Sequence, residues 1–425
     1  MNEVANSNGQ RSGAVALSPM PQERNPKSLI TETMRQWCLH TLGGRLEAVV
    51  LTGSLARDEA TWQQTDHGVR FLSDAEFIVI LSDKAAIPSQ AQVTLICSGA
   101  EEELRNNGVL CKLSFGAVHE SFLLNLGETI FGYELLTCGE VVYGDPEILL
   151  SRARSVTGVS QEDAWRLLAN RTVELLEIVP ELVNAREPLS EAAQYRLTKL
   201  YCDMATSILV FQGEFVAGYK ARAAKLCQLH EQGLLSGLPF NECWFVDVVG
   251  RSTKSKITHS WEGPSPFSTL DSVQQAITVL DSLWTWELAQ IHGATLPSAY
   301  DMLRLHMQKQ SLKARLRGWA YAARRRGALD SLRHCWRWLR LLQSASPRYC
   351  VYAAGLQAVS SFKFPVSSTA NTSRLGQLET QNSKLETISR WLPIVNFSVR
   401  TLPDEKDLAE AVLSNYREFL VETRS

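Results

Sequence analysis

Short apolar runs alternate with amphipathic segments over the first 155 residues. The runs LEAVVL and AEFIVIL are rich in β-branched residues, which is typical of buried strands. A third run, VLCKLSFGAV, alternates apolar with other residues and is predicted as a strand at 109–118. Helical spacing of apolar residues predicts helices at 28–42, 89–106 and 128–139. Because helices and strands alternate, residues 28–155 are expected to form a small α/β domain.

Beyond residue 155 the pattern becomes helical almost throughout. Segments such as EDAWRLLANRTVELLEIVPELV and LDSVQQAITVLDSLWTWELAQI repeat apolar residues at helical intervals. This spacing predicts an all-α domain over 156–365, built as a helical bundle. The predicted fold class is therefore α+β, with an N-terminal α/β domain followed by an all-α helical domain.

The segments outside these two domains are polar or short. Residues 1–27 are polar and are expected to be disordered, and the polar stretch 366–387 is expected to be a linker. The last segment, 388–425, combines a strand-like run, IVNFSV, with an amphipathic helix.

The composition indicates the cellular compartment in which the protein is expected. Nine scattered cysteines without a CxxC pair favour free thiols in a reducing compartment over a disulfide framework. The N-terminus lacks the apolar core of a signal peptide, and no apolar stretch approaches the roughly 18 residues that span a bilayer. A cytoplasmic protein without a transmembrane segment is expected, and association with a membrane surface stays open.

The stretch LTGSLARDEA places Gly53 and Ser54 directly after the first predicted strand, with a helix expected from Ser54. A glycine turn lets backbone amides approach a phosphate without a side chain in the way, and the Ser54 hydroxyl adds a hydrogen-bonding group. Alone, such a turn is most often a structural helix cap.

Two carboxylates stand at the head of the second strand, in SDAEFIVIL. Asp74 and Glu76 are two residues apart, so both point the same way while Ala75 and Phe77 point into the core. A carboxylate pair of this kind is suited to holding Mg²⁺ against a triphosphate. Alone, it is usually a solvated strand edge, but the order of the two motifs favours a joint site.

Taken together, these motifs resemble the nucleotidyltransferase fold of the DNA polymerase β superfamily. The segment FGYELLTCGEVVYGDPEILL resembles the helix–strand–helix ending of its minimal nucleotidyltransferase domains, so the resemblance covers about 30–155. It implies transfer of a nucleoside monophosphate from an NTP to an acceptor hydroxyl or phosphate. Gly53 and Ser54 would cradle the β- and γ-phosphates, Asp74 and Glu76 would ligate Mg²⁺, and Arg57 is placed to offset phosphate charge.

The sequence departs from this superfamily pattern in two places. The gap between Ser54 and Asp74 is longer than usual, and a polar excursion around Gly68 is expected to absorb it. The third carboxylate of catalytic members should stand in VLCKLSFGAV, where the same-face positions hold Lys112 and Ser114. Glu120, just past this strand, is the candidate substitute; the alternative is a solvated loop acid.

In the helical region, YRLTKLYCDMATSIL resembles the first long helix that follows the catalytic domain in superfamily members acting on small molecules. Tyr195, Lys199 and Asp203 form one polar stripe at helical spacing. Lys199 is a candidate contact to the triphosphate. The equally good alternative is a surface ion pair between Lys199 and Asp203.

A basic, tryptophan-rich stretch occupies 313–342. Between Lys313 and Arg340 the chain has nine Lys and Arg residues against one acid. Such helices suit an anionic membrane surface or a nucleic-acid backbone, or they are bundle helices with a solvated basic face. The stretch therefore supports a second hypothesis, in which the protein has the nucleotidyltransferase fold but acts as a non-catalytic binding or scaffold module.

Overall fold

The computed structural model divides into two compact units. It describes residues 25–66, 68–153, 158–184, 187–258, 265–326, 328–361, 388–394 and 405–419. The first unit contains the chain up to His119 together with Glu140–Asp145, and the second contains Glu120–Gly139 and everything from Pro146 onward. The expected boundary at 155, the linker 366–387, most of IVNFSV and residues 1–24 lie outside the described residues.

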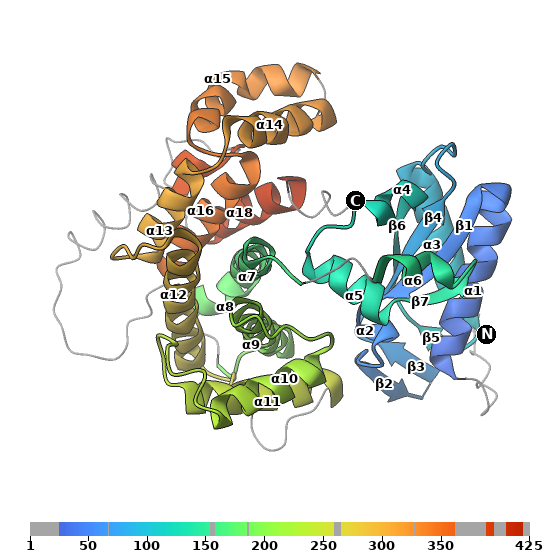
Figure 1. The fold of residues 1–425 in the computed structure, drawn as a ribbon, viewed down its shortest axis with the longest axis horizontal. Helices are drawn as coiled ribbons and strands as arrows, with labels where there is room; N and C mark the ends of the chain where they lie inside the picture. The colour runs from blue at the N-terminus through green and yellow to red at the C-terminus, as the bar shows by residue number, and fades with distance from the viewer. Residues whose placement is uncertain are drawn as a thin grey trace, which may run out of the picture. The chain divides into compact units, whose positions relative to one another are not determined.

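A four-stranded mixed sheet forms the centre of the first unit (Figure 1). Its order is β6-β4-β1-β7, and its strands are β1 (Leu46–Thr52), β4 (Ala75–Leu81), β6 (Leu113–His119) and β7 (Glu140–Tyr143). β4 runs parallel to β6, whereas β1 runs antiparallel to both β4 and β7. β1 and β4 are almost wholly buried, as their β-branched sequences predict.

Helices α1 (Pro26–Leu42) and α3 (Gln90–Asn106) pack against each other and supply much of this unit's core. Asn25 caps α1, and Ser89 and Gln92 form a capping box at the start of α3. The close approach of the two helices needs Gly99, because a Cβ there would lie 2.3 Å from the Trp37 ring.

The polar excursion around Gly68 is a hairpin of β2 (Trp62–Thr65) and β3 (Gly68–Phe71). It forms a second small sheet with β5 (Val109–Leu110). VLCKLSFGAV, expected as one strand, is thus divided between β5 and β6 at Cys111-Lys112. The 3₁₀ turn η1 (Gly43–Arg45) and the short α2 (Gly53–Ala56) complete the unit.

The second unit is helical. Its elements are α4 (Glu120–Leu124), α5 (Ile130–Cys138), α6 (Glu147–Ala153), α7 (Gln161–Glu174), η2 (Leu175–Ile178), α8 (Val179–Val183), α9 (Glu191–Phe211), α10 (Tyr219–Glu231), α11 (Glu242–Thr258), α12 (Leu270–His292), α13 (Ala299–Gln308), α14 (Leu312–Arg326), α15 (Ala328–Ser344), α16 (Pro347–Ser361) and α18 (Glu405–Phe419).

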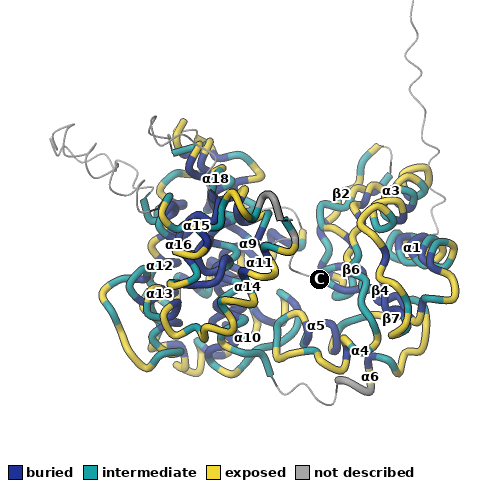
Figure 2. The backbone as a smooth tube through the Cα atoms, turned by 90° about the horizontal axis from the view of Figure 1, so that it is seen from above, coloured by how far each residue is buried: buried dark blue, intermediate teal, exposed yellow. Residues whose placement is uncertain are grey.

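The core of the helical unit forms around α9, in which every residue from Leu200 to Phe211 is buried. Figure 2 shows dark-blue buried segments on the inward sides of these helices and exposed segments on their outer sides. Trp165 of α7 and Trp284 of α12 meet edge to face in this core, with ring centroids 5.2 Å apart. The predicted α+β class, with an N-terminal α/β region and a helical C-terminal part, is confirmed.

Candidate active site

The turn after β1 brings the chain against a carboxylate of β4. Gly53 has a φ of +70°, which favours glycine, and a Cβ at this position would lie 2.5 Å from Glu76 Oε2. The strand register explains the proximity, because Thr52 is paired with Glu76 across β1 and β4. The Gly-Ser turn and the second carboxylate therefore lie side by side.

The two predicted carboxylates share the solvent-facing side of the start of β4. Asp74 and Glu76 are exposed, whereas Ala75 and Phe77 are buried, so the alternation expected from the sequence is present. Exposed carboxylate oxygens at a sheet rim can be reached by both a cation and a ligand.

Hydrogen bonds fix the segment that leads into β4. The Ala75 amide donates to the Lys112 carbonyl at 2.9 Å. Thr61, which is fully buried, donates its amide to Ser73 Oγ at 3.0 Å, and its carbonyl accepts from the Leu72 amide at 2.8 Å. These bonds hold the backbone on both sides of Asp74, so the carboxylate pair is presented from a rigid support.

The neighbouring strand contributes no acid beside the pair. Ser114 of β6 is the register partner of Glu76, and both side chains are exposed. Lys112 precedes this strand and is also exposed. The position expected to hold a third carboxylate therefore carries a hydroxyl.

Glu120 begins α4 directly after the last residue of the same strand. It follows His119, whose register partner is Leu81, the last residue of β4. Because β4 and β6 are parallel, this end lies about 20 Å from Glu76 at the usual rise per strand residue. The structure therefore does not bring Glu120 to Asp74 and Glu76.

Arg57 lies in an ion pair within the first unit. Its Nε is 3.2 Å from Glu59 Oε2, and the two side chains are only 8% and 5% exposed. The guanidinium is thus committed to a buried partner that sequence reasoning did not identify. Arg57 and Glu59 are two residues apart in a turn, so they lack the i, i+4 spacing by which an ion pair can be predicted from a helical sequence.

A second ionic contact, also absent from the sequence analysis, ties three parts of the unit together. Lys27 Nζ is 2.9 Å from both Asp58 Oδ1 and Glu140 Oε2. Burial acts to lower the pKa of Lys27, but the hydrogen bonds to the two carboxylates raise it above its ordinary value. The bridge joins α1, the turn after α2 and β7, which are distant in sequence.

Lys199 lies half-buried in the helical unit, near other charged side chains. The nearby Arg171 guanidinium, followed by burial, lowers the pKa of Lys199 to about 8. Arg171 Nε donates to Asp203 Oδ2 at 2.7 Å and also forms an ion pair with Glu174. Asp203, the expected partner of Lys199, is therefore bound to Arg171 from α7.

The donor set at the start of β4 fits magnesium bound together with a nucleotide. Within the parts of the chain that the structure describes, no cluster of three or more His, Cys, Asp or Glu side chains is arranged as a metal site. Asp74 and Glu76 offer hard carboxylate oxygens, and Mg²⁺ commonly combines one or two such ligands with substrate phosphates and waters.

Comparisons with known proteins find similarity to solved structures alone. No protein-family model and no curated protein matches this chain. Among solved structures, the chain is similar to spectinomycin adenyltransferase AAD(9) from Enterococcus faecialis, with 11% identity, a TM-score of 0.36, and coverage of 60% of this chain and 99% of that chain. It is also similar to a nucleotidyltransferase-like protein from Exiguobacterium sibiricum 255-15, with 11% identity, a TM-score of 0.20, and coverage of 61% and 80%.

The first structure is named as an adenyltransferase and the second as a nucleotidyltransferase-like protein, and at these TM-scores neither likeness carries an argument about this chain. Among the described helices, none is long and apolar enough to cross a membrane.

Proposed function

We propose that the chain is a Mg²⁺-dependent nucleotidyltransferase that transfers a nucleoside monophosphate from an NTP to an acceptor hydroxyl or phosphate. The observation that carries this proposal is the close approach of the Glu76 carboxylate to Gly53, where an added Cβ would lie 2.5 Å from Oε2. It joins a turn suited to phosphates with a carboxylate pair suited to magnesium, at one exposed rim of the sheet.

Each residue of this rim has a role in the proposed reaction. The backbone amides of the Gly53-Ser54 turn would bind a phosphate beside the Glu76 carboxylate, and the Ser54 hydroxyl, which has no hydrogen-bond partner among the described residues, can donate to it. Asp74 and Glu76 would hold Mg²⁺, which when bound stabilises negative charge on the reacting phosphates. In such transfers, positioning and electrostatics supply most of the catalysis.

The bonds exchanged in the proposed reaction are those of an in-line displacement. The acceptor oxygen bonds to the α-phosphorus while the bond from that phosphorus to the bridging oxygen breaks, and pyrophosphate leaves. The acceptor proton passes to solvent, because Ser114 offers no carboxylate beside Glu76 to accept it. We therefore expect a nucleotide-positioning enzyme with weak general-base assistance.

The reaction is tested with each of the four NTPs labelled at the α-phosphate, Mg²⁺ and a pool of hydroxyl-bearing metabolites. We expect the labelled α-phosphate to move to an acceptor, with one pyrophosphate released per transfer. The D74N/E76Q double variant should lose this transfer by at least about a thousandfold, since it removes both metal ligands. E102Q, which changes an exposed acid on α3, serves as the control and should keep full activity.

Absence of transfer with every NTP would contradict the proposal. So would equal transfer by the wild type and the double variant.

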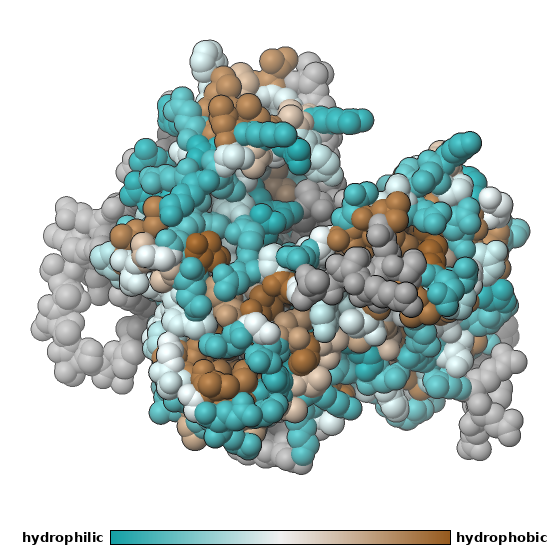
Figure 3. Space-filling model, viewed as in Figure 1, coloured by the Kyte–Doolittle hydropathy of each residue, from teal (hydrophilic) through white to brown (hydrophobic). Residues whose placement is uncertain are grey.

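A second candidate is a non-catalytic module that docks on an anionic membrane surface. The observation that favours it is a set of large apolar side chains of α14 and α15 that are exposed among basic ones: Leu312, Leu316, Leu332, Trp336 and Leu339. Figure 3 shows apolar side chains among polar ones at the top of the view, where Figure 1 places these two helices. Trp336 is 82% exposed, and exposed tryptophan with arginine suits a lipid interface.

Vesicle flotation separates this candidate from the enzyme. Vesicles containing phosphatidylserine should retain the wild type. L332S/W336S should reduce this retention several-fold, because it removes apolar area that would be buried in the lipid. L95S, on the exposed face of α3, is the matched control. If L332S/W336S is retained on the vesicles as well as the wild type, the membrane candidate is wrong. It is also wrong if the wild type binds RNA and does not bind the vesicles.

A further inference from the structure

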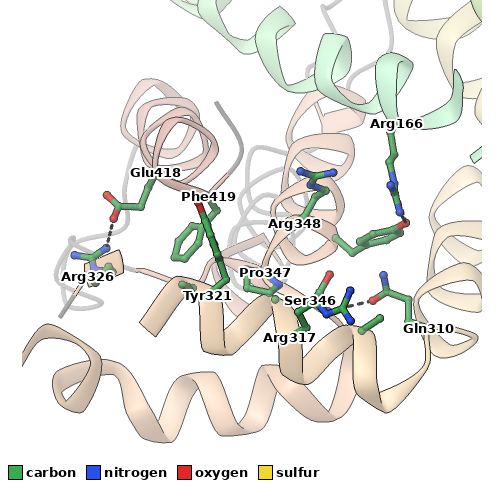
Figure 4. Close-up of a pocket in the computed structure, with 14 residues that line it drawn as sticks. Arg166, Gln310, Arg317, Tyr321, Arg326, Ser346, Pro347, Arg348, Glu418 and Phe419 are labelled. Atoms are coloured by element: carbon green, nitrogen blue, oxygen red, sulfur yellow. Dashed lines mark hydrogen bonds and ion pairs between the residues drawn. The ribbon is translucent and has the colours of Figure 1, made fainter. Parts of the chain in front are cut away.

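A pocket of about 430 Å³ lies within the helical unit (Figure 4). It is lined by residues of α7, α14, α16 and α18 and by the segment before α14. Its volume falls within the range of small-molecule sites, which is about 300–1,000 Å³. The pocket is separate from the rim that holds Asp74 and Glu76, because those residues belong to the first unit.

The side chains that line the pocket carry a net positive charge, which favours binding of an anion. Four arginines line the pocket against a single acid: Arg166, Arg317, Arg326 and Arg348 against Glu418. Arg326 is neutralised by Glu418, with their Nη1 and Oε1 atoms 3.3 Å apart. Arg317 is exposed and has no hydrogen bond or ion pair with another described residue. An oxyanion entering the pocket would therefore meet at least one uncommitted guanidinium.

The part of the pocket around Arg166 is preorganised. Arg166 forms an ion pair with Glu162, with Nε and Oε1 2.9 Å apart. Its Nη2 also donates to the Tyr349 hydroxyl at 3.2 Å, and this hydroxyl in turn donates to Glu162. Arg166 is thus held in one orientation at the pocket wall, which lowers the entropic cost of binding a ligand there.

The remaining lining is aromatic and apolar. Tyr321 is 48% exposed, and Phe419 is buried. Figure 4 draws Tyr321 and Phe419 toward one end of the pocket and Arg166 and Arg317 toward the other. Gly318 allows α14 to lie close to Pro347 at the start of α16, because a Cβ at Gly318 would come within 3.1 Å of Pro347 Cδ. Aromatic walls beside a cationic end suit a flat ring that carries an acidic group.

We propose that this pocket binds a small organic anion carrying an aromatic ring, with its oxyanion at Arg317 and Arg348 and its ring against Tyr321 and Phe419. A carboxylate and a phosphate satisfy the same arginine geometry, so the shared chemistry is an aromatic oxyanion. The site does not depend on the proposed nucleotide transfer.

Calorimetry on the full chain tests the proposal with four probes: phenyl phosphate, benzoate, inorganic phosphate and benzyl alcohol. We expect phenyl phosphate or benzoate to bind with one-to-one stoichiometry, at least tenfold more tightly than phosphate or benzyl alcohol. R317Q should weaken this binding at least tenfold, because it removes the uncommitted cation. R340Q, which changes an exposed arginine of α15 outside the pocket, should leave it unchanged.

Two further variants assign the binding to this pocket. Y321A should weaken the aromatic anions several-fold, and D74N/E76Q should bind them like the wild type. Matching urea midpoints for R317Q, Y321A and the wild type would show that each variant is folded. No saturable binding of either aromatic anion, equal binding of benzyl alcohol, or full binding by R317Q would overturn the proposal.

Discussion

At the scale of single residues, Gly53 carries two constraints at once. Its φ of +70° is unfavourable for any other residue, and a Cβ would collide with Glu76 Oε2 at 2.5 Å. We expect G53A to cost about 1–3 kcal/mol of unfolding free energy and to push the Glu76 carboxylate aside. Urea unfolding measures the first effect, and Mg²⁺-nucleotide affinity measures the second.

Gly43 provides the matched control. It also has a positive φ, of +54°, but a Cβ there would have nothing within 4 Å. G43A should therefore share the backbone cost of G53A and leave nucleotide affinity unchanged. Equal nucleotide affinity in both variants would show that the proximity of Gly53 and Glu76 has no bearing on binding.

The buried carboxyl of Glu287 in α12 should make the free energy of unfolding depend on pH. The residue is 0% exposed, and burial raises the pKa of Glu287 to about 8, although neighbouring Ser207 acts to lower it. The unfolded chain titrates this group near its ordinary value of 4.5. Its stabilising contribution is therefore complete below about pH 4.5 and is lost as pH rises to about 8.

The E287Q variant isolates this effect, because glutamine is nearly isosteric and does not ionise. Relative to the wild type, its unfolding free energy should rise between pH 5 and 8 by at most about 1.4 kcal/mol per pH unit. Urea unfolding across this range measures the difference, with E102Q as an exposed control. A difference between E287Q and the wild type that does not change with pH would contradict a neutral buried Glu287.

At the scale of elements, the register of β4 and β6 locates the missing carboxylate. Ser114 is exposed beside Glu76, so an acid at this position would face the same side. We expect S114D to raise affinity for Mg²⁺-nucleotide about tenfold, or about 1.4 kcal/mol, by adding a third carboxylate ligand. Calorimetric titration of Mg²⁺ with nucleotide measures the change.

N106D adds the same charge at an exposed position of α3 and controls for net charge. If S114D and N106D have equal affinities for Mg²⁺-nucleotide, the geometry assigned to Ser114 is wrong.

The elements also show what local sequence can predict. β1 and β4 are predicted correctly because buried strands have short runs of β-branched residues, and their alternation exposes Asp74 and Glu76. The hairpin of β2 and β3 was expected only as a polar excursion, since its residues WQQT and GVRF have little apolar periodicity. Its pairing depends on backbone hydrogen bonds, which leave little trace in the sequence.

At the scale of the whole molecule, the α+β class follows from periodicity, whereas the long-range contacts do not. Arg171 of α7 binds Asp203 of α9, a contact that the local spacing of Lys199 and Asp203 does not indicate. Lys27 bridges Asp58 and Glu140 across more than a hundred residues. Such partners are set by tertiary packing, so local spacing cannot identify them. The aromatic and arginine-lined pocket likewise gathers residues from four helices.

The central claim is that the carboxylates beside the Gly53 turn bind a nucleoside triphosphate together with magnesium. Calorimetric titration of the full chain with each NTP, with and without Mg²⁺, tests it most directly. We expect saturable binding of at least one NTP that requires Mg²⁺ and is lost, by at least about a hundredfold, in D74N/E76Q but not in E102Q. Absence of saturable binding for every NTP, or binding that survives in D74N/E76Q, would contradict it.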